Sequence, residues 1–126
     1  MGNRKKHFLK FWFPVIIYAI LIFSVSSMEK PFTADFEIIG MDKILHILEY
    51  AVLGFLLGRA IAASLPNASP SKLIFIVFII GTLYGFTDEL HQYFIPGRDA
   101  SIWDLLSDST GSFLGALAFT KKYIRQ

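Results

Sequence analysis

Titratable side chains occur at helical spacing in an apolar stretch that begins near residue 42. Asp42, His46, Glu49 and Tyr50 are separated by 4, 3 and 1 residues, which puts them on one face of a helix. A carboxylate beside a histidine in a partly desolvated pocket can act as a general base. The pattern therefore predicts a polar helical face that moves a proton.

Two later apolar stretches carry polar faces of the same kind. In residues 81–92 one face holds Glu89 and Gln92. Asp88 flanks this face, and His91 lies further round the helix. The last stretch has six polar or small residues on one face: Ser101, Asp104, Asp108, Gly111, Ser112 and Gly115. Ionisable groups are expensive to keep within a membrane, so each face is a candidate functional site.

The composition of the chain places these faces in a membrane. The chain has 126 residues, of which 54% are hydrophobic and 16% aromatic, and its mean hydropathy is +0.53. These values indicate a single integral membrane domain, residues 1–126, and are too apolar for a water-soluble domain of this length. The net charge is only +2, and the Lys and Arg residues form no basic stripe, which argues against a nucleic-acid partner. The chain has no cysteine, which excludes disulfides and thiolate chemistry.

Four apolar segments predict an all-α protein with four transmembrane helices. Their approximate ranges are residues 11–28, 42–64, 72–95 and 101–120. They lack the short alternating pattern of a membrane β-barrel. A cleaved signal peptide is the alternative for the first segment, because Ser24, Ser26 and Ser27 follow a basic start and an apolar run. That run is longer than a signal peptide requires, which favours a retained helix.

Charge is sorted by side along these four segments. All ten carboxylates fall on one side, and nine of the twelve Lys and Arg residues fall on the other. Because Lys and Arg are retained in the cytoplasm, both termini and the connection at residues 59–72 are predicted inside. The three polar faces then share one depth and predict a polar cavity at the outer face. Two helices direct their N-termini toward it, which suits an anion. The first segment carries no such polar residue and is expected to be a supporting helix.

Several of these residues also have structural explanations. Asp42 could be a helix N-cap, and Ser101 with Asp104 resembles a capping box. Asp99 is expected to be a loop charge, and Lys43 is expected to extend toward the membrane surface. Under these explanations the residues belong to helix ends and loops, and none of them contributes to a functional site.

Residues deeper in the segments have other structural explanations. Gly111 and Gly115 are expected to serve helix packing. His91 lies off the main face and could point toward lipid head groups. For the three deepest carboxylates, the structural alternative is an interhelical salt bridge with Arg98 or a histidine. These carboxylates are Glu49, Glu89 and Asp108.

Three motifs between residue 42 and about residue 116 carry a family resemblance. They are Asp42-Lys43-x-x-His46 followed by Tyr50 and Leu53-Gly54, then Glu89-x-x-Gln92 with Pro96 and Arg98, then Ser101, Asp104, Asp108-x-x-Gly111 and Gly115. In this order and spacing the chain resembles the VanZ-like family of small bacterial membrane proteins. Many relatives carry Asn at the position of Asp108, which implies that a hydrogen-bonding side chain rather than a charge can suffice there.

The resemblance implies a multi-pass protein of the bacterial cytoplasmic membrane. The family's namesake is associated with resistance to the glycopeptide antibiotic teicoplanin, so the resemblance implies a link to the cell envelope. With the polar faces, it leads to the hypothesis of an enzyme or binding protein for an anionic head group of an envelope lipid or glycolipid.

This hypothesis assigns a role to each polar residue of the faces. Proton transfer is assigned to Glu89, His46, Glu49 and His91. Substrate binding is assigned to Asp42, Tyr50, Gln92, Arg98, Ser101, Asp104 and Asp108. The sequence leaves open whether catalysis occurs, which cofactor is used and what the oligomeric state is.

Two alternatives stay open beside this hypothesis. One is a metal site, although no ligand spacing here is diagnostic of zinc and no metal ligand is therefore assigned. Its available ligands are His46, Glu49, Glu89, His91, Asp104 and Asp108. The other is a non-catalytic membrane partner whose polar layer is structural or docks an exported protein. A transporter is disfavoured, because alternating access usually requires two structural repeats that move against each other, and these four helices contain no internal repeat.

Overall fold

The computed structural model describes residues 2–28 and 40–125, and this part of the chain is 84% helix with no strand. The helices are α1 (Asn3–His7), the π-helical turn η1 (Phe8–Trp12), α2 (Phe13–Ser26), α3 (Met41–Ser64), α4 (Pro70–Tyr93) and α5 (Ile102–Ile124). The prediction of an all-α protein is therefore confirmed for the described residues. The acidic residues expected in the first outer loop, Glu29, Asp35 and Glu37, lie outside them.

Within the described ranges, three helices are long and apolar enough to cross a membrane. They are the continuous helix Asn3–Ser26, then Met41–Ser64 and Pro70–Tyr93, each of 24 residues. The expected fourth span, α5, has a comparable length of 23 residues but does not meet this criterion. The reason is its polar content, which includes Asp104, Ser107, Asp108, Ser109 and Ser112, all of them buried.

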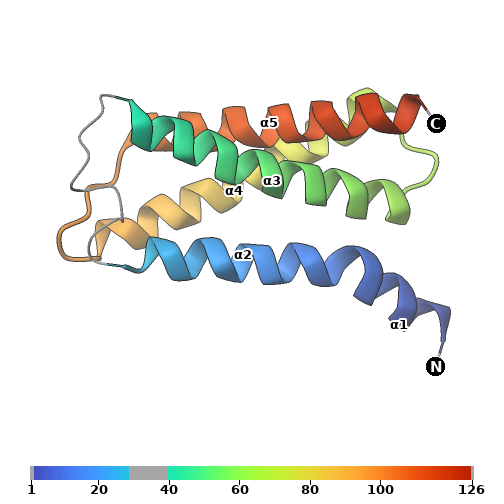
Figure 1. The fold of residues 1–126 in the computed structure, drawn as a ribbon, viewed down its shortest axis with the longest axis horizontal. Helices are drawn as coiled ribbons and strands as arrows, with labels where there is room; N and C mark the ends of the chain where they lie inside the picture. The colour runs from blue at the N-terminus through green and yellow to red at the C-terminus, as the bar shows by residue number, and fades with distance from the viewer. Residues whose placement is uncertain (1, 29–39, 126) are drawn as a thin grey trace.

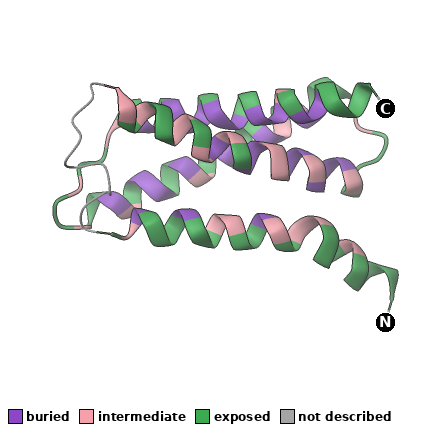
Figure 2. Cartoon of the chain, viewed as in Figure 1, coloured by how far each residue is buried: buried purple, intermediate pink, exposed green. Residues whose placement is uncertain are grey.

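The two sides of α5 differ sharply in chemistry. Its exposed side chains include Trp103, Leu106, Phe113 and Leu114, whereas Asp104, Asp108 and most of its serines are buried. The same outward exposure of large apolar side chains holds along the other helices (Figure 2). The outer surface of α5 is therefore mostly apolar, although its average composition is less apolar than that of the other long helices.

The first long helix contains one wide turn. Residues Phe8–Trp12 form the π-helical turn η1, directly before Pro14. Proline has no N–H, so the Lys10 carbonyl loses its ordinary helical donor, and the proline ring crowds that carbonyl. A wide turn relieves this crowding and lets the helix continue into α2.

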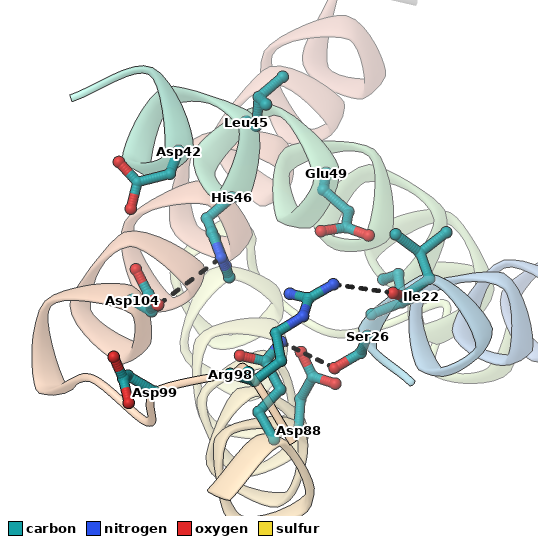
Figure 3. Close-up of a pocket in the computed structure, with 13 residues that line it drawn as sticks. Ile22, Ser26, Asp42, Leu45, His46, Glu49, Asp88, Arg98, Asp99 and Asp104 are labelled. Carbon is teal, nitrogen blue, oxygen red and sulfur yellow. Dashed lines mark hydrogen bonds and ion pairs between the residues drawn. The ribbon is translucent and has the colours of Figure 1, made fainter. Parts of the chain in front are cut away.

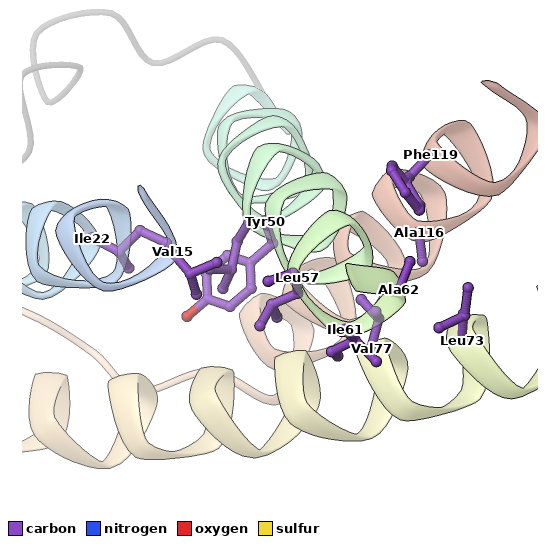
Figure 4. Packing of buried hydrophobic residues seen from close by; sticks show 12 residues of the cluster. Val15, Ile22, Tyr50, Leu57, Ile61, Ala62, Leu73, Val77, Ala116 and Phe119 are labelled. Atoms are coloured by element: carbon purple, nitrogen blue, oxygen red, sulfur yellow. The ribbon is translucent and has the colours of Figure 1, made fainter. Parts of the chain in front are cut away.

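The helices form a bundle in which α3 packs most closely on α5 (Figure 1). The α2 helix contacts α3 and α4. Both termini and the α3–α4 connection lie at one end, and the α4–α5 connection lies at the other. A core of buried apolar side chains from α2, α3, α4 and α5 fills the interior, with Tyr50 fully buried beside Val15 (Figure 4).

Small residues allow the close approach of α3 and α5. A Cβ atom at Gly111 would collide with the Ile47 carbonyl oxygen, and one at Gly115 would collide with that of Ala51. The expected packing role of these two glycines is thus confirmed. On α4, a Cβ atom at Gly85 would lie 3.0 Å from Asp108, so Gly85 makes room for that carboxylate.

Candidate functional site

A cavity of about 280 Å³ lies at the end of the bundle that holds the α4–α5 connection. Its lining comes from α2, α3, α4, α5 and that connection: Ile22, Val25, Ser26, Asp42, Leu45, His46, Glu49, Asp88, Gln92, Gly97, Arg98, Asp99 and Asp104. In Figure 3 the side chains of Glu49 and Arg98 point into the same space. The cavity therefore brings together residues from all three predicted polar faces.

His46 connects α3 to α5 through hydrogen bonding. Its Nδ1 lies 2.7 Å from Asp108 Oδ1, and its Nε2 lies 3.9 Å from Asp104 Oδ2. Asp108 is fully buried. The predicted interhelical pair between a deep carboxylate and a histidine is thus present, and it holds the imidazole in a defined orientation.

Lys43 has a different role from the one expected. Its Nζ lies 2.5 Å from both Asp42 Oδ2 and Asp104 Oδ1, so it bridges two carboxylates beside the cavity. The sequence did not predict this pairing. Asp42 is not an N-cap: Gly40, with φ +85°, caps α3, and no side chain among the described residues makes the capping bond.

Glu89 closes the junction between α4 and α5. Its Oε2 accepts a hydrogen bond from the Ser101 backbone N–H at 3.0 Å. Ser101 is the N-cap of α5, and its Oγ accepts from the Trp103 N–H. In a capping box the N3 residue Asp104 would take the Ser101 N–H. Glu89 takes it instead, because Asp104 is held by Lys43.

Arg98 and Gln92 are both anchored to the end of α2 and the residues just after it. The Arg98 Nε donates to the Met28 carbonyl at 2.9 Å, and its Nη2 donates to the Val25 carbonyl at 3.1 Å. Gln92 Nε2 donates to Ser26 Oγ at 2.8 Å. The first segment was expected to be a supporting helix without polar site residues. The end of α2 does support Arg98 and Gln92, and its Ser26 also lines the cavity.

Three polar lining residues received no functional role from the sequence. Asp99 was expected to be a loop charge, and Asp88 was placed at the flank of its helical face, yet both line the cavity. Ser26 does as well. The sequence offered one clue to a role for Ser26, which belongs to a cluster of serines at the end of an apolar segment. The same cluster also fits a signal-peptide cleavage region, so it did not identify a site residue.

Five assigned residues are not part of the cavity lining: Glu89, Ser101 and Asp108, whose contacts are given above, and His91 and Tyr50. His91 Nε2 lies 2.9 Å from Ser27 Oγ, and its ring stacks on Phe23 at 4.4 Å between centroids. Tyr50 is fully buried, with its hydroxyl 3.5 Å from Asp88 Oδ2. His91 therefore joins α4 to α2, and Tyr50 belongs to the core beneath the site.

Three residues form a group with the geometry of ligands. One nitrogen or oxygen atom from each of His46, Glu89 and Asp108 lies within 4.8 Å of the others. Each residue comes from a different helix. This group could hold a cation, whereas Arg98 is the cavity residue suited to an anion.

The comparison with protein families covers nearly the whole chain. A family model described as VanZ/LLP1 matches residues 3–124. No curated protein and no solved structure matches the chain.

Proposed function

The chain belongs to the VanZ/LLP1 family, and from that premise we propose that it binds the head group of an anionic envelope lipid or glycolipid in the cavity and acts on it there. The observation that carries the proposal is the lining of one cavity by Arg98 together with several carboxylates. An arginine suits a phosphate, and carboxylates accept hydrogen bonds from sugar hydroxyls. A glycolipid head group offers both features.

Arg98 keeps donors available for such a ligand. A guanidinium has five N–H groups, and two of them donate to the carbonyls of Val25 and Met28. Those bonds hold the side chain in place and reduce the entropy lost when a ligand binds. The first turns of α3 and α5 also lie at the cavity, where their partial positive charge supports an anion.

Proton transfer in this proposal belongs to Glu49 and His46. Both line the cavity. The Glu49 carboxylate has no hydrogen-bond partner in the described part of the chain, so it is free to accept a proton from a bound hydroxyl group. Glu89, held by the Ser101 N–H, would keep the α4–α5 junction in position beside the site.

The proposal includes four spans and an orientation in the bacterial cytoplasmic membrane. The outer surface of α5 is apolar, and its 23 residues have a length of about 34 Å at 1.5 Å per residue, enough to cross the hydrocarbon core. The basic residues at 4–10 and 121–125 favour cytoplasmic termini. The cavity would then open at the outer face, where envelope lipids present their head groups.

Lipids bound to purified protein provide the test. Arg98→Lys keeps the charge but loses the planar fork, so the amount of anionic lipid that co-purifies, measured by mass spectrometry, should fall by about tenfold or more. Arg59→Lys is the matched control, because Arg59 lies over the Phe11 ring and does not line the cavity. Equal lipid retention in both variants would contradict the proposal.

A structural role in a membrane complex is the second candidate. The contacts of His46 with Asp108, and of Lys43 with Asp104, join α3 to α5, so the polar layer could serve to hold the helices together. Under this alternative, variants at the site would fail to accumulate in the membrane. Under the proposed function, they would accumulate and lose lipid binding or tolerance of glycopeptide antibiotics.

A further inference from the structure

We propose that His46, Glu89 and Asp108 bind a transition-metal dication, with Zn²⁺ as the test ion. The proposed function assigns no metal, so this inference goes beyond it. The three residues come from α3, α4 and α5, and one potential ligand atom of each lies within 4.8 Å of the others. Three separate helices therefore direct ligand atoms to one point.

The carboxylates of this group have oxygens left without partners. Asp108 is fully buried, and Glu89 is 6% exposed. Asp108 Oδ1 meets His46, and Glu89 Oε2 accepts the Ser101 N–H. Asp108 Oδ2 and Glu89 Oε1 are buried and have no hydrogen-bond partner in the described part of the chain. A buried, unpaired carboxylate oxygen is costly, and a bound cation removes that cost.

The nearby basic side chains are engaged elsewhere. Lys43 is shared between Asp42 and Asp104, and Arg98 donates to the backbone carbonyls of Val25 and Met28. Within residues 2–28 and 40–125, His46 is thus the basic group that contacts the buried carboxylates of the cluster. A dication supplies two positive charges where the described side chains supply at most one.

The ligand types select the class of ion. One imidazole nitrogen with two carboxylate oxygens suits Zn²⁺ and related transition metals, whereas Mg²⁺ and Ca²⁺ favour all-oxygen sites. Ligand atoms about 2.1 Å from a tetrahedral zinc ion are about 3.4 Å apart, so small side-chain rotations would complete the site. Three protein ligands leave a fourth position open. His46 also lines the cavity, so the proposed metal site borders the space assigned to the head group.

The experiment uses untagged full-length protein in detergent, stripped with a chelator and titrated with Zn²⁺ alone. Calorimetry and metal analysis after removal of free ion are expected to give one Zn²⁺ per chain, with excess Mg²⁺ failing to compete. Asp108→Asn and Glu89→Gln should each weaken binding tenfold or more. Asp99→Asn removes the same charge from an exposed cavity residue outside the group and should leave Zn²⁺ affinity unchanged.

A second measurement needs no variant. Co²⁺ added to the stripped protein should show the stronger visible absorption of a four- or five-coordinate ion. A spectrum identical to that of aqueous Co²⁺, or a chain that retains no Zn²⁺, would overturn the metal site and leave the buried carboxyl groups to hold protons instead. Equal loss of Zn²⁺ affinity in Asp99→Asn and Asp108→Asn would overturn it too. Lipid retention by the metal-free protein is measured in parallel, so the two proposals can fail separately.

Discussion

The Nδ1 atom of His46 lies 2.7 Å from the Oδ1 atom of Asp108, which gives a fully buried carboxylate of α5 its partner on α3. The same imidazole lines the cavity. One contact therefore joins helix packing to the candidate site. Substitutions at either residue have to be interpreted with stability and function measured separately.

Two substitutions at Asp108 separate the charge from the shape of its side chain. Asp108→Ala leaves His46 half-buried without its partner and should lower the free energy of unfolding by about 3–5 kcal/mol. Asp108→Asn retains an oxygen acceptor and should stay close to the parent protein or exceed it, because polar functional sites are often less stable than their neutral versions. Thermal unfolding in detergent measures both. Equal destabilisation would show that the charge itself is needed for folding.

Where α3 and α5 pack most closely, a larger side chain is expected to destabilise the protein. Gly115→Ala places a methyl group against the Ala51 backbone, which should destabilise the fold by about 1–3 kcal/mol and reduce accumulation in the membrane. Gly2→Ala is the control, since a Cβ atom there meets nothing within 4 Å. A Gly115→Ala protein as stable as that control would mean that the helices separate easily.

Function should depend on Glu49 and His46, the two cavity residues to which proton transfer is assigned, more than on any other pair. Glu49→Gln preserves the shape of the side chain and removes its charge, while His46→Ala removes the other proton carrier. Both variants should reach the membrane and fail to restore growth under an envelope-targeting antibiotic in a strain that lacks this protein. Full complementation by both would assign these residues a structural role. Failure of both to accumulate would favour the structural alternative.

Topology can be tested independently of the site. With four spans, reporters fused at either terminus should be active in the cytoplasm, because Arg4–Lys10 and Lys121–Arg125 are basic. Figure 1 places both termini at the end opposite the α4–α5 connection. A carboxyl-terminal reporter active outside the membrane would show that α5 does not span it.

Local spacing in the sequence determined the helices and the faces on which the polar residues lie. The positions of His46 and Glu49 on one face, and of Glu89 and Gln92 on another, follow from 3.6 residues per turn, which needs no knowledge of the neighbouring helices. The Gly111 and Gly115 spacing likewise predicted close helix packing, because residues four apart lie on one side of a helix.

Only the tertiary structure decided which of these groups meet. The rotation and order of the helices around the bundle pair His46 with Asp108 and turn His91 toward Ser27 at the end of α2. They also anchor Arg98 on the carbonyls of Val25 and Met28. The Ser101 N–H could have bonded within its own helix, yet it reaches Glu89 on α4. Helical periodicity fixes where a side chain points along its own helix. Which of several chemically similar partners that side chain meets depends on how whole helices pack against one another. No short stretch of residues encodes that packing.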